Sequence, residues 1–575
     1  MDKHAESAIN QTLIYGTHEC RRWRAEIFVR HSPIAKELAA GFIRQARLNP
    51  IDPNTAGNTW LRETIERLRF GHRKLSALID DDEISQLAER NAKSINQTYI
   101  RLSGCCSFDA VIERLKQRVE AEDVPWPAGI KSSDSTSSKQ QKHAGAVARA
   151  RDPRWWRRAL RKVIARKVES VLRESGAICK RRAPYVSDVA FARWQTTQRR
   201  NRNTMQNLIA LSNEGDELPL QECIDSSISN PINRRNELMV RMRGWETIAD
   251  SLNLQGVMLT LTAPSQFHSY HYSGEFNSKY NSSNPIETIA YLNGVWSRIR
   301  SAWHRVGIKS IGFRICEPHH DGTPHFHFLL FFPPPQWQIA WSIFRQHALS
   351  LDGDEHGAAE HRCNYRLIDK TIGSATGYVA KYVAKNIDGY GFSKDELDQE
   401  SDIKANDGAA RVRAWASLWG IRQFQQIGSI SVSVYRELRR LAVPLIEQPE
   451  KVEIARVAAD RGDWAAFVDA MGGAFIRREE QLLRPLKQLA EKLGRYGDEI
   501  RRILGLVMQA TANQLLHHIQ TRTKTWEIVP LWKLKDIRER GSPYPSCNAP
   551  PPHEAAGKAV NRVCGGPSQK VRSTI

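Results

Sequence analysis

The sequence predicts an α+β protein, with an antiparallel sheet flanked by helices in the middle of the chain and mainly helical regions on either side. Three segments, GVMLTLTAPS (256–265), SIGFRICEP (310–318) and HFHFLLFF (325–332), are rich in apolar, β-branched and aromatic residues over strand lengths. Helical patterns separate the first two segments and follow the third. A strand, a helix, a hairpin and another helix are typical of an antiparallel sheet with helices packed against it.

The first 125 residues are predicted to be helical. Trp60, Ile65 and Leu68 recur near the 3.6-residue period among charged neighbours, as core-facing positions of a helix do. The segment that follows, 126–146, is rich in Ser, Lys and Gln and has little to bury, so we predict a linker there.

A basic, helical DNA-binding region is predicted over 147–234. Residues 151–202 hold 16 Lys or Arg against 4 acidic residues, and Trp155 and Trp156 lie among the basic side chains. Cations with interleaved aromatics suit phosphates and unstacked bases. The alternative is a solvated helix face with two core tryptophans.

Three regions complete the chain. The sheet and its helices are expected within 235–445. Mixed three- and four-residue spacing of Leu and Ile, interrupted by Pro485, predicts a helical region over 446–540, either a helical hairpin or a surface for a partner. The Pro- and Gly-rich tail, 541–575, is predicted to be disordered.

The composition indicates a polyanionic partner and a reducing compartment. Lys and Arg number 84 against 63 Asp and Glu, a net charge of +21 that favours nucleic acid. The most apolar run, 326–332, is far shorter than the ~20 residues of a membrane span, and we see no signal peptide. Nine irregularly spaced cysteines without a CxxC pair fit a cytoplasmic protein. No phosphate-binding loop of the GxxxxGK[ST] type occurs, which disfavours a built-in ATPase.

His325 and His327 are the first candidate site residues. Residues i and i+2 of a strand point to one face, so both imidazoles can bind one cation. Asp321-Gly322 signals a turn. A three-residue loop, Asp321 to Thr323, would put Glu317 opposite His327 on the same face, whereas a two-residue loop would turn Glu317 away. Two imidazoles and a carboxylate with open positions suit Mg²⁺ or Mn²⁺. The alternative is a pair of packed or surface histidines.

Tyr378 and Tyr382 form the second candidate group. Tyrosines four residues apart lie one turn apart on one helical face, and Lys381 and Lys385 repeat the spacing beside them. Phenols near ammonium groups and a metal suit phosphoryl transfer to tyrosine. For such spacing alone, an amphipathic helix with aromatic core contacts is the ordinary explanation.

These segments together resemble a known family. HHDGTPHFHFLLFF looks like the His–hydrophobe–His (HUH) motif of rolling-circle endonucleases, GYVAKYVAKNIDG resembles their two-tyrosine motif, and VMLTLTAPSQFH resembles their first strand motif. The chain is more narrowly similar to the phage replication gene A proteins, over residues 181–441. The resemblance implies metal ligands at His325 and His327 and nucleophiles at Tyr378 and Tyr382. It leaves the third ligand open between Glu317 and a histidine, His319 or His320.

The resemblance also implies a function. The expected activity is site-specific nicking and joining of single-stranded or unpaired origin DNA through a 5′-phosphotyrosine, to initiate rolling-circle replication of a phage genome. A host helicase and a host polymerase are the expected partners, in the cytoplasm of a bacterial host. Two alternatives stay open: an HUH relaxase or transposase, and a non-catalytic basic DNA-binding regulator.

Overall fold

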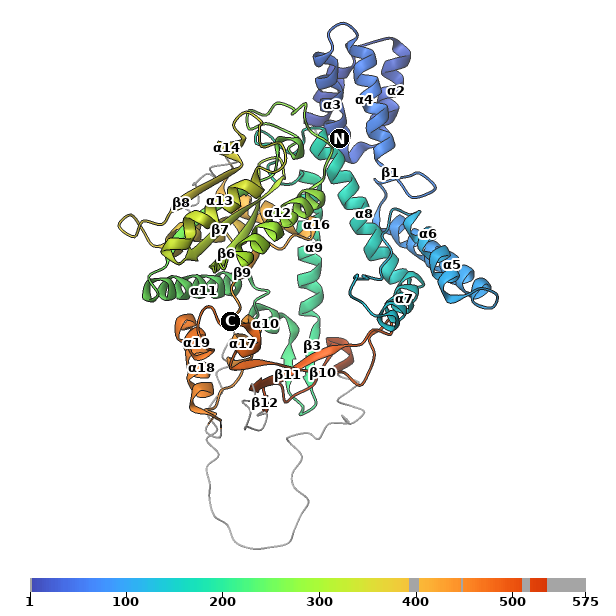
Figure 1. The fold of residues 1–575 in the computed structure, drawn as a ribbon. Helices are drawn as coiled ribbons and strands as arrows, with labels where there is room; N and C mark the ends of the chain where they lie inside the picture. Colours follow the sequence, from blue (N-terminus) through green and yellow to red (C-terminus); the bar gives the residue numbers. More distant parts are fainter. Residues whose placement is uncertain (1–2, 392–402, 446–447, 509–517, 535–575) are drawn as a thin grey trace, which may run out of the picture.

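The computed structural model of the chain describes residues 3–391, 403–445, 448–508 and 518–534. The chain is a mixture of helices and small antiparallel sheets, in agreement with the α+β prediction (Figure 1). The predicted tail, 541–575, lies outside the described residues. In the part of the chain that the structure covers, no helix is both long and apolar enough to cross a membrane.

The N-terminal region is built from six helices around one apolar core. A short hairpin of β1 (Arg69–Phe70) and β2 (Leu75–Ser76) interrupts them. The helices are α1 (Lys3–Thr12), α2 (His18–Arg30), α3 (Ala35–Leu48), α4 (Pro53–Arg67), α5 (Asp81–Ser103) and α6 (Phe108–Glu120).

The predicted linker contains a helix, so that prediction is wrong for its second half. Helix α7 (Thr136–Ala150) begins at Ser135, whose side chain caps the backbone of Ser138. Few residues of this segment are large and apolar, but Val147 and Ala150 suffice to pack α7 against the N-terminal core. Composition alone missed this because small residues at helical spacing can bury a face.

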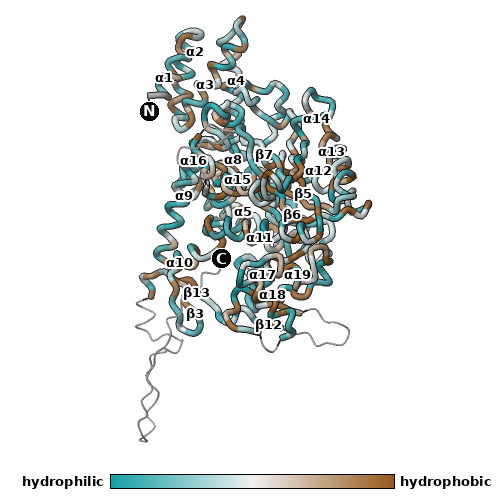
Figure 2. The backbone as a smooth tube through the Cα atoms, turned by 90° about the vertical axis from the view of Figure 1, so that its left-hand side faces the viewer, coloured by the Kyte–Doolittle hydropathy of each residue, from teal (hydrophilic) through white to brown (hydrophobic). Residues whose placement is uncertain are grey.

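Two long helices, α8 (Pro153–Glu174) and α9 (Asp188–Gln206), carry the basic region. Trp156 is fully buried and donates its indole N–H to the Ala150 carbonyl at 2.7 Å, so it is a core residue and is not available for base stacking. Helix α9 buries no residue completely and stays largely hydrophilic along its length (Figure 2). The end of this region is not helical, since it forms β3 (Leu208–Ser212) and β4 (Glu217–Pro219) before the short helix α10 (Leu220–Asp225).

The central sheet has five antiparallel strands in the order β8-β5-β7-β6-β9. The strands are β5 (Gln255–Thr262), β6 (Ile311–Pro318), β7 (Pro324–Phe332), β8 (Cys363–Leu367) and β9 (Phe424–Ile427). Alternate residues of β7 enter two separate cores. Phe326 and Phe328 pack with residues of α12 (Pro285–Arg305) and α13 (Trp337–Ala348), whereas Leu329 and Phe331 pack with residues of α11 (Pro231–Ser251) and α15 (Ala375–Ile387). Figure 1 shows α11, α12 and α13 beside the sheet. Helices α14 (Ala358–His361), α16 (Ala405–Trp419) and α17 (Val432–Leu438) complete the region.

The β6–β7 hairpin differs in register from the sequence prediction. Glu317 pairs with His325 rather than with His327, because the turn is closed by the His319 N–H donating to the Thr323 carbonyl at 2.7 Å. The shift is two residues, and a two-residue shift keeps every side chain on its face. Glu317 therefore still shares a face with both histidines.

Among the described residues of the C-terminal region, α18 (Glu450–Arg461) and α19 (Trp464–Ala470) are helical, and residues 531–534 form a further helical turn. The helical prediction is wrong for residues 483–508 and 518–530. These segments form β10 (Leu483–Leu489), β11 (Arg501–Met508) and β12 (His518–Gln520), while β13 (Trp526–Pro530) pairs with β3. Pro485 pairs within β10, where a proline is tolerated more easily than inside a helix. Leu483, Leu506 and Ile519 bury against the central core, so tertiary packing overrode the helical spacing.

A buried arginine joins α8 to the sheet. Arg173 and Asp321 are 1% and 0% exposed and lie 3.6 Å apart. Arg173 also donates hydrogen bonds to the Asp321 carbonyl at 2.9 Å and to the Phe267 carbonyl at 2.8 Å. The Asp321 carboxylate in turn accepts from the backbone N–H groups of Ser269 and Thr323. This network fixes the turn between β6 and β7.

Arg173→Met is expected to cost about 3–5 kcal/mol of unfolding free energy, because it removes the buried guanidinium and its hydrogen bonds from Asp321, whose remaining ion-pair partner is then His268 at 3.6 Å. Urea unfolding of the full chain measures the loss. Arg157→Met, an exposed position on the same helix, is the control and should stay within about 0.5 kcal/mol of the parent. Equal urea midpoints for the two variants would show that Arg173 does not support the turn.

Glu169 is a buried carboxyl in the same helix. It accepts hydrogen bonds from the Ser187 backbone N–H and from the Ser187 hydroxyl. Burial raises its pKa to about 7 even though both hydrogen bonds oppose the shift. In the unfolded chain Glu169 loses its proton near the ordinary glutamate pKa of about 4.3. The folded chain therefore keeps this proton up to about pH 7.

Because the folded state binds this proton more tightly, stability should fall as pH rises from about 4.5 to 7 and level off above it. The size of the effect is on the order of 3 kcal/mol. Glu169→Gln should flatten that slope in urea unfolding between pH 5 and 8, whereas Glu89→Gln, an exposed position, should leave it unchanged. If Glu169→Gln leaves the pH dependence of the unfolding free energy unchanged, that dependence comes from other titrating groups.

Candidate metal centre and tyrosine helix

The face of the sheet beneath α15 carries the candidate site. On β7, His325 and His327 point to this face, and Glu317 points to it from β6. One ligand atom from each of the three residues lies within 4.8 Å of the others, and no other group of three or more such side chains with this spacing occurs among the described residues. The imidazole Nε2 atoms are 2.8 Å apart, and His327 Nε2 lies 4.0 Å from Glu317 Oε2.

These three side chains fit a divalent cation. They present two nitrogens and a carboxylate from one side, which leaves the opposite positions open. The neighbouring strand orients one ligand, since the Thr260 hydroxyl lies 3.2 Å from His327 Nδ1. Burial, with the nearby His319, His327 and Lys385, holds the pKa of His325 well below its usual range, so its imidazole is neutral and can donate a lone pair.

His319 and His320 lie outside this group of ligand atoms. The His319 ring stacks on His325 with centroids 3.9 Å apart, and the His320 ring contacts Tyr272 with centroids 5.7 Å apart. Of the three residues considered for the third ligand, Glu317 is therefore the one whose ligand atom lies within 4.8 Å of those of both His325 and His327.

Helix α15 lies over the ligands and carries both tyrosines. It begins at Ser374, whose side chain caps the Gly377 N–H, and it buries Val379 and Val383 in the core. Tyr382, which is half-buried between these positions, lies over His327, with ring centroids 4.5 Å apart. Tyr382 is thus the tyrosine in contact with the candidate metal ligands.

Tyr378 occupies a different environment, one turn earlier on α15. Its ring lies 4.9 Å from the Arg366 guanidinium carbon on β8. Its hydroxyl is buried without a hydrogen-bond partner among the described residues. The two tyrosines therefore share a helix face, but only Tyr382 contacts the histidine pair.

The two lysines also differ. Lys385 lies 3.9 Å from Glu317 and over the Tyr185 ring, whereas Lys381 is exposed. Tyr185 has a positive φ of 72°, an unusual conformation for a residue with a side chain, and its N–H donates to the His320 carbonyl in the hairpin turn. The segment before α9 thus reaches the site.

Asn386 links α15 to the candidate ligand Glu317. The sequence analysis did not predict a role for this residue. It is fully buried, and its amide N–H donates to the Glu317 carboxylate and to the Tyr382 carbonyl. Gln423, next to β9, donates to the Asn386 amide oxygen at 3.1 Å. Asn386 lies four residues after Tyr382, so the spacing that relates the two tyrosines extends to it.

The family model of the bacteriophage replication gene A protein matches residues 80–390, more than half of the chain. The chain belongs to this family. The match includes α15, the β6–β7 hairpin and much of the basic region.

Individual relatives give the same result for this family member. It is 41% identical over 378 residues to the replication protein of Haemophilus phage HP1, covering 65% of this chain and 48% of the relative. It is 41% identical to the replication gene A protein of Escherichia phage 186, covering 67% and 56%. A probable replication endonuclease from a prophage-like region of Salmonella typhi is 31% identical, covering 70% and 51%. The chain thus spans about half the length of the curated relatives it matches. No solved structure matches the chain.

Proposed function

We propose that this family member is a metal-dependent DNA endonuclease of the HUH class that nicks and rejoins one strand to initiate rolling-circle replication of a phage genome. The observation that carries the proposal is the convergence of Glu317, His325 and His327 on one sheet face, with Tyr382 of α15 against His327. The name "replication endonuclease" given to the Salmonella relative supports the activity.

Glu317, His325 and His327 hold the cofactor in this proposal. A divalent cation, Mg²⁺ or Mn²⁺, would polarise a non-bridging oxygen of the scissile phosphate. The substrate in this proposal is single-stranded or unpaired origin DNA. His325 is buried and His327 half-buried beneath α15, so a phosphate must be free of a duplex to reach them. The net charge of +21 attracts that polyanion.

A tyrosine of α15 supplies the nucleophile. Its oxygen attacks the phosphorus, the bond to the 3′ oxygen breaks, and that oxygen leaves as a hydroxyl with the proton that the phenol gives up. The 5′ phosphate stays esterified to tyrosine, which conserves the bond energy. A later attack by a 3′-hydroxyl rejoins the strand and frees the tyrosine, so joining needs no ATP.

The lysines and the partners complete the proposal. Lys385, beside Glu317, and Lys381, at the exposed surface of α15, would stabilise phosphate charge during the transfer. The free 3′-hydroxyl would prime a host polymerase while a host helicase unwinds the duplex, in the cytoplasm of the bacterial host.

The test is the covalent adduct. Purified chain is incubated with single-stranded DNA that carries the phage origin and a 3′ label, with Mg²⁺, Mn²⁺ or EDTA, and denatured. A labelled band at the mass of chain plus DNA, present with either cation and absent with EDTA, is the expected result. Tight DNA binding without any adduct would favour a non-catalytic DNA-binding protein.

Asn386→Ala is expected to weaken Mn²⁺ binding about 10- to 100-fold, because Glu317 loses the amide that orients it. Isothermal titration of the metal-free chain with Mn²⁺ measures the change. Asn203→Ala, at an exposed position on α9, is the matched control and should bind Mn²⁺ like the parent. Unchanged affinity in Asn386→Ala would limit Asn386 to packing α15.

A further inference from the structure

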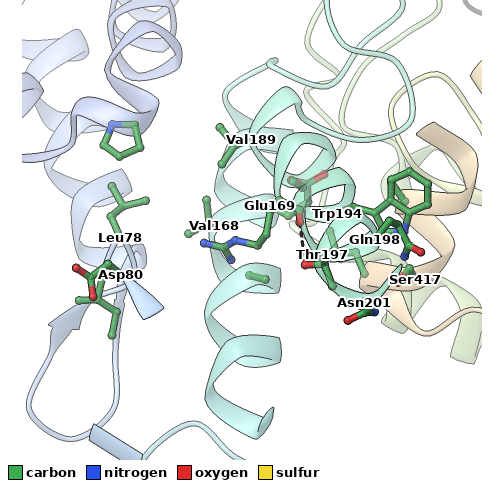
Figure 3. Close-up of a pocket in the computed structure, with 17 residues that line it drawn as sticks. Leu78, Asp80, Val168, Glu169, Val189, Trp194, Thr197, Gln198, Asn201 and Ser417 are labelled. Carbon is green, nitrogen blue, oxygen red and sulfur yellow. Dashed lines mark hydrogen bonds between the residues drawn. The ribbon is translucent and has the colours of Figure 1, made fainter. Parts of the chain in front are cut away.

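A cavity of about 440 Å³ lies where the N-terminal region, α8, α9 and α16 meet, and none of the candidate metal ligands lines it. Figure 3 shows which elements line it: the loop around Leu78 and Asp80, Val168 and Glu169 of α8, and Ser417 of α16. Helix α9 contributes the longest wall, with Trp194, Thr197, Gln198 and Asn201 among its lining residues.

The interior and the rim of this cavity differ in character. Inside are the apolar side chains of Leu78, Val168 and Val189, an indole from Trp194, and the Glu169 carboxyl. At the rim are exposed polar groups, among them the amides of Gln198 and Asn201, three residues apart and therefore neighbours on α9. A flat, partly apolar ligand with a polar edge matches this distribution.

The charge around the cavity indicates what such a ligand is attached to. Arg193 lines the cavity, and Arg200, two turns later on the same face of α9, is exposed. Cations spaced along one face beside an apolar cavity suit a chain with regularly spaced anions and flat side groups. Single-stranded DNA has both, because its bases unstack and its phosphates repeat along the strand.

One helix, α16, contacts both the cavity and the helix that carries the candidate tyrosines. Helix α16, which supplies Ser417 and Leu418 to the cavity, packs against α15. Two residues before Ser417, the Trp415 indole donates to the Gly322 carbonyl in the turn between β6 and β7 at 2.9 Å. A strand held in the cavity would thus lie one helix away from the tyrosines and from the ligand hairpin.

We propose that this cavity binds one unstacked base of single-stranded DNA, with the arginines of α9 on the adjoining phosphates. The proposal rests on the proposed function, since it assigns a second contact to the same substrate. It predicts that part of the affinity for DNA comes from bases held outside the metal centre.

The experiment compares two 30-nucleotide probes of equal charge, labelled at one end: oligothymidylate and an abasic deoxyribose-phosphate backbone of the same length. Fluorescence anisotropy with full-length chain, in EDTA so that no chemistry occurs, gives the ratio of their affinities. Because phosphate contacts cancel in this ratio, it reports the contribution of bases. Ser417→Leu places a side chain in the cavity, and Gln195→Leu places the same side chain on exposed α9 outside the cavity lining.

We expect Ser417→Leu to lower the ratio about five- to fiftyfold, the range of one lost base contact, and Gln195→Leu to leave it unchanged. Gln198→Ala, which removes an amide without filling space, should lower it less. A ratio that is the same in the parent and in Ser417→Leu, or equally reduced by Gln195→Leu, overturns the proposal. The adduct test is separate: a base-dependent ratio lost in Ser417→Leu, together with no adduct, would keep the base site and reject the nuclease.

Discussion

His325→Ala and His327→Ala are each expected to lower strand cleavage by about 10³-fold or more, while the affinity for single-stranded DNA stays close to that of the parent. Each variant removes one of the three proposed ligands, which converge from β6 and β7. A lost cation removes several kcal/mol of stabilisation from the transition state. Binding should persist because the exposed arginines of α9 are unaffected. The measurements are adduct yield with Mg²⁺ and anisotropy with the same oligonucleotide.

His356→Ala, an exposed histidine beyond the sheet, is the control for these variants and should cleave normally. Glu317→Ala tests the third ligand and should also be inactive. If Glu317→Ala cleaves like the parent while His319→Ala or His320→Ala is inactive, the third ligand is a histidine. Normal cleavage by both His325→Ala and His327→Ala would remove the metal centre from the mechanism.

The second large effect concerns the tyrosines. The double variant Tyr378→Phe with Tyr382→Phe is expected to form no adduct, and each single variant should form some. Tyr382→Phe should be the slower of the two by about 10²-fold, because Tyr382 contacts His327 whereas Tyr378 lies beside Arg366. Neither single variant should complete cutting and rejoining as well as the parent. Quenched time courses with labelled origin DNA separate the two steps.

Tyr365→Phe, on the exposed edge strand β8, is the matched control and should behave like the parent. An adduct in the double variant would place the nucleophile elsewhere in the chain. Complete cutting and rejoining by Tyr378→Phe would replace the two-tyrosine scheme with one in which Tyr382 acts alone.

Short-range patterns predicted the centre of the molecule well. The period of two put His325 and His327 on one face of β7, and the structure places them there. Glu317 lies on that face as predicted, although the observed register of the β6–β7 hairpin differs from the predicted one by two residues. The turn between the strands depends on Arg173, which is 148 residues away from Asp321 in the sequence. A local turn signal carries no information about such a partner.

Other features were missed because they depend on packing. The leucines beyond residue 478 have helical spacing, but burial of Leu483 and Leu506 against the central core favours strands. Trp156 is surrounded by arginines in sequence, yet it fills the N-terminal core. The role of Asn386 could not be predicted from the sequence, because it depends on α15 lying over Glu317. Each error comes from a contact between segments far apart in the chain.

The position of Arg173 has a practical consequence for dissecting the protein. The sequence suggested a boundary near residue 235, but a fragment that starts there would lack α8 and with it Arg173, which would leave His268 as the remaining ion-pair partner of Asp321 and the carbonyl groups of Asp321 and Phe267 without their donor. Any fragment that keeps this network must therefore include α8, and α8 in turn buries Trp156 and Leu160 in the N-terminal core. One helix thus couples the N-terminal core to the sheet, so we expect an exchange of the candidate site between related phages to carry the N-terminal region with it.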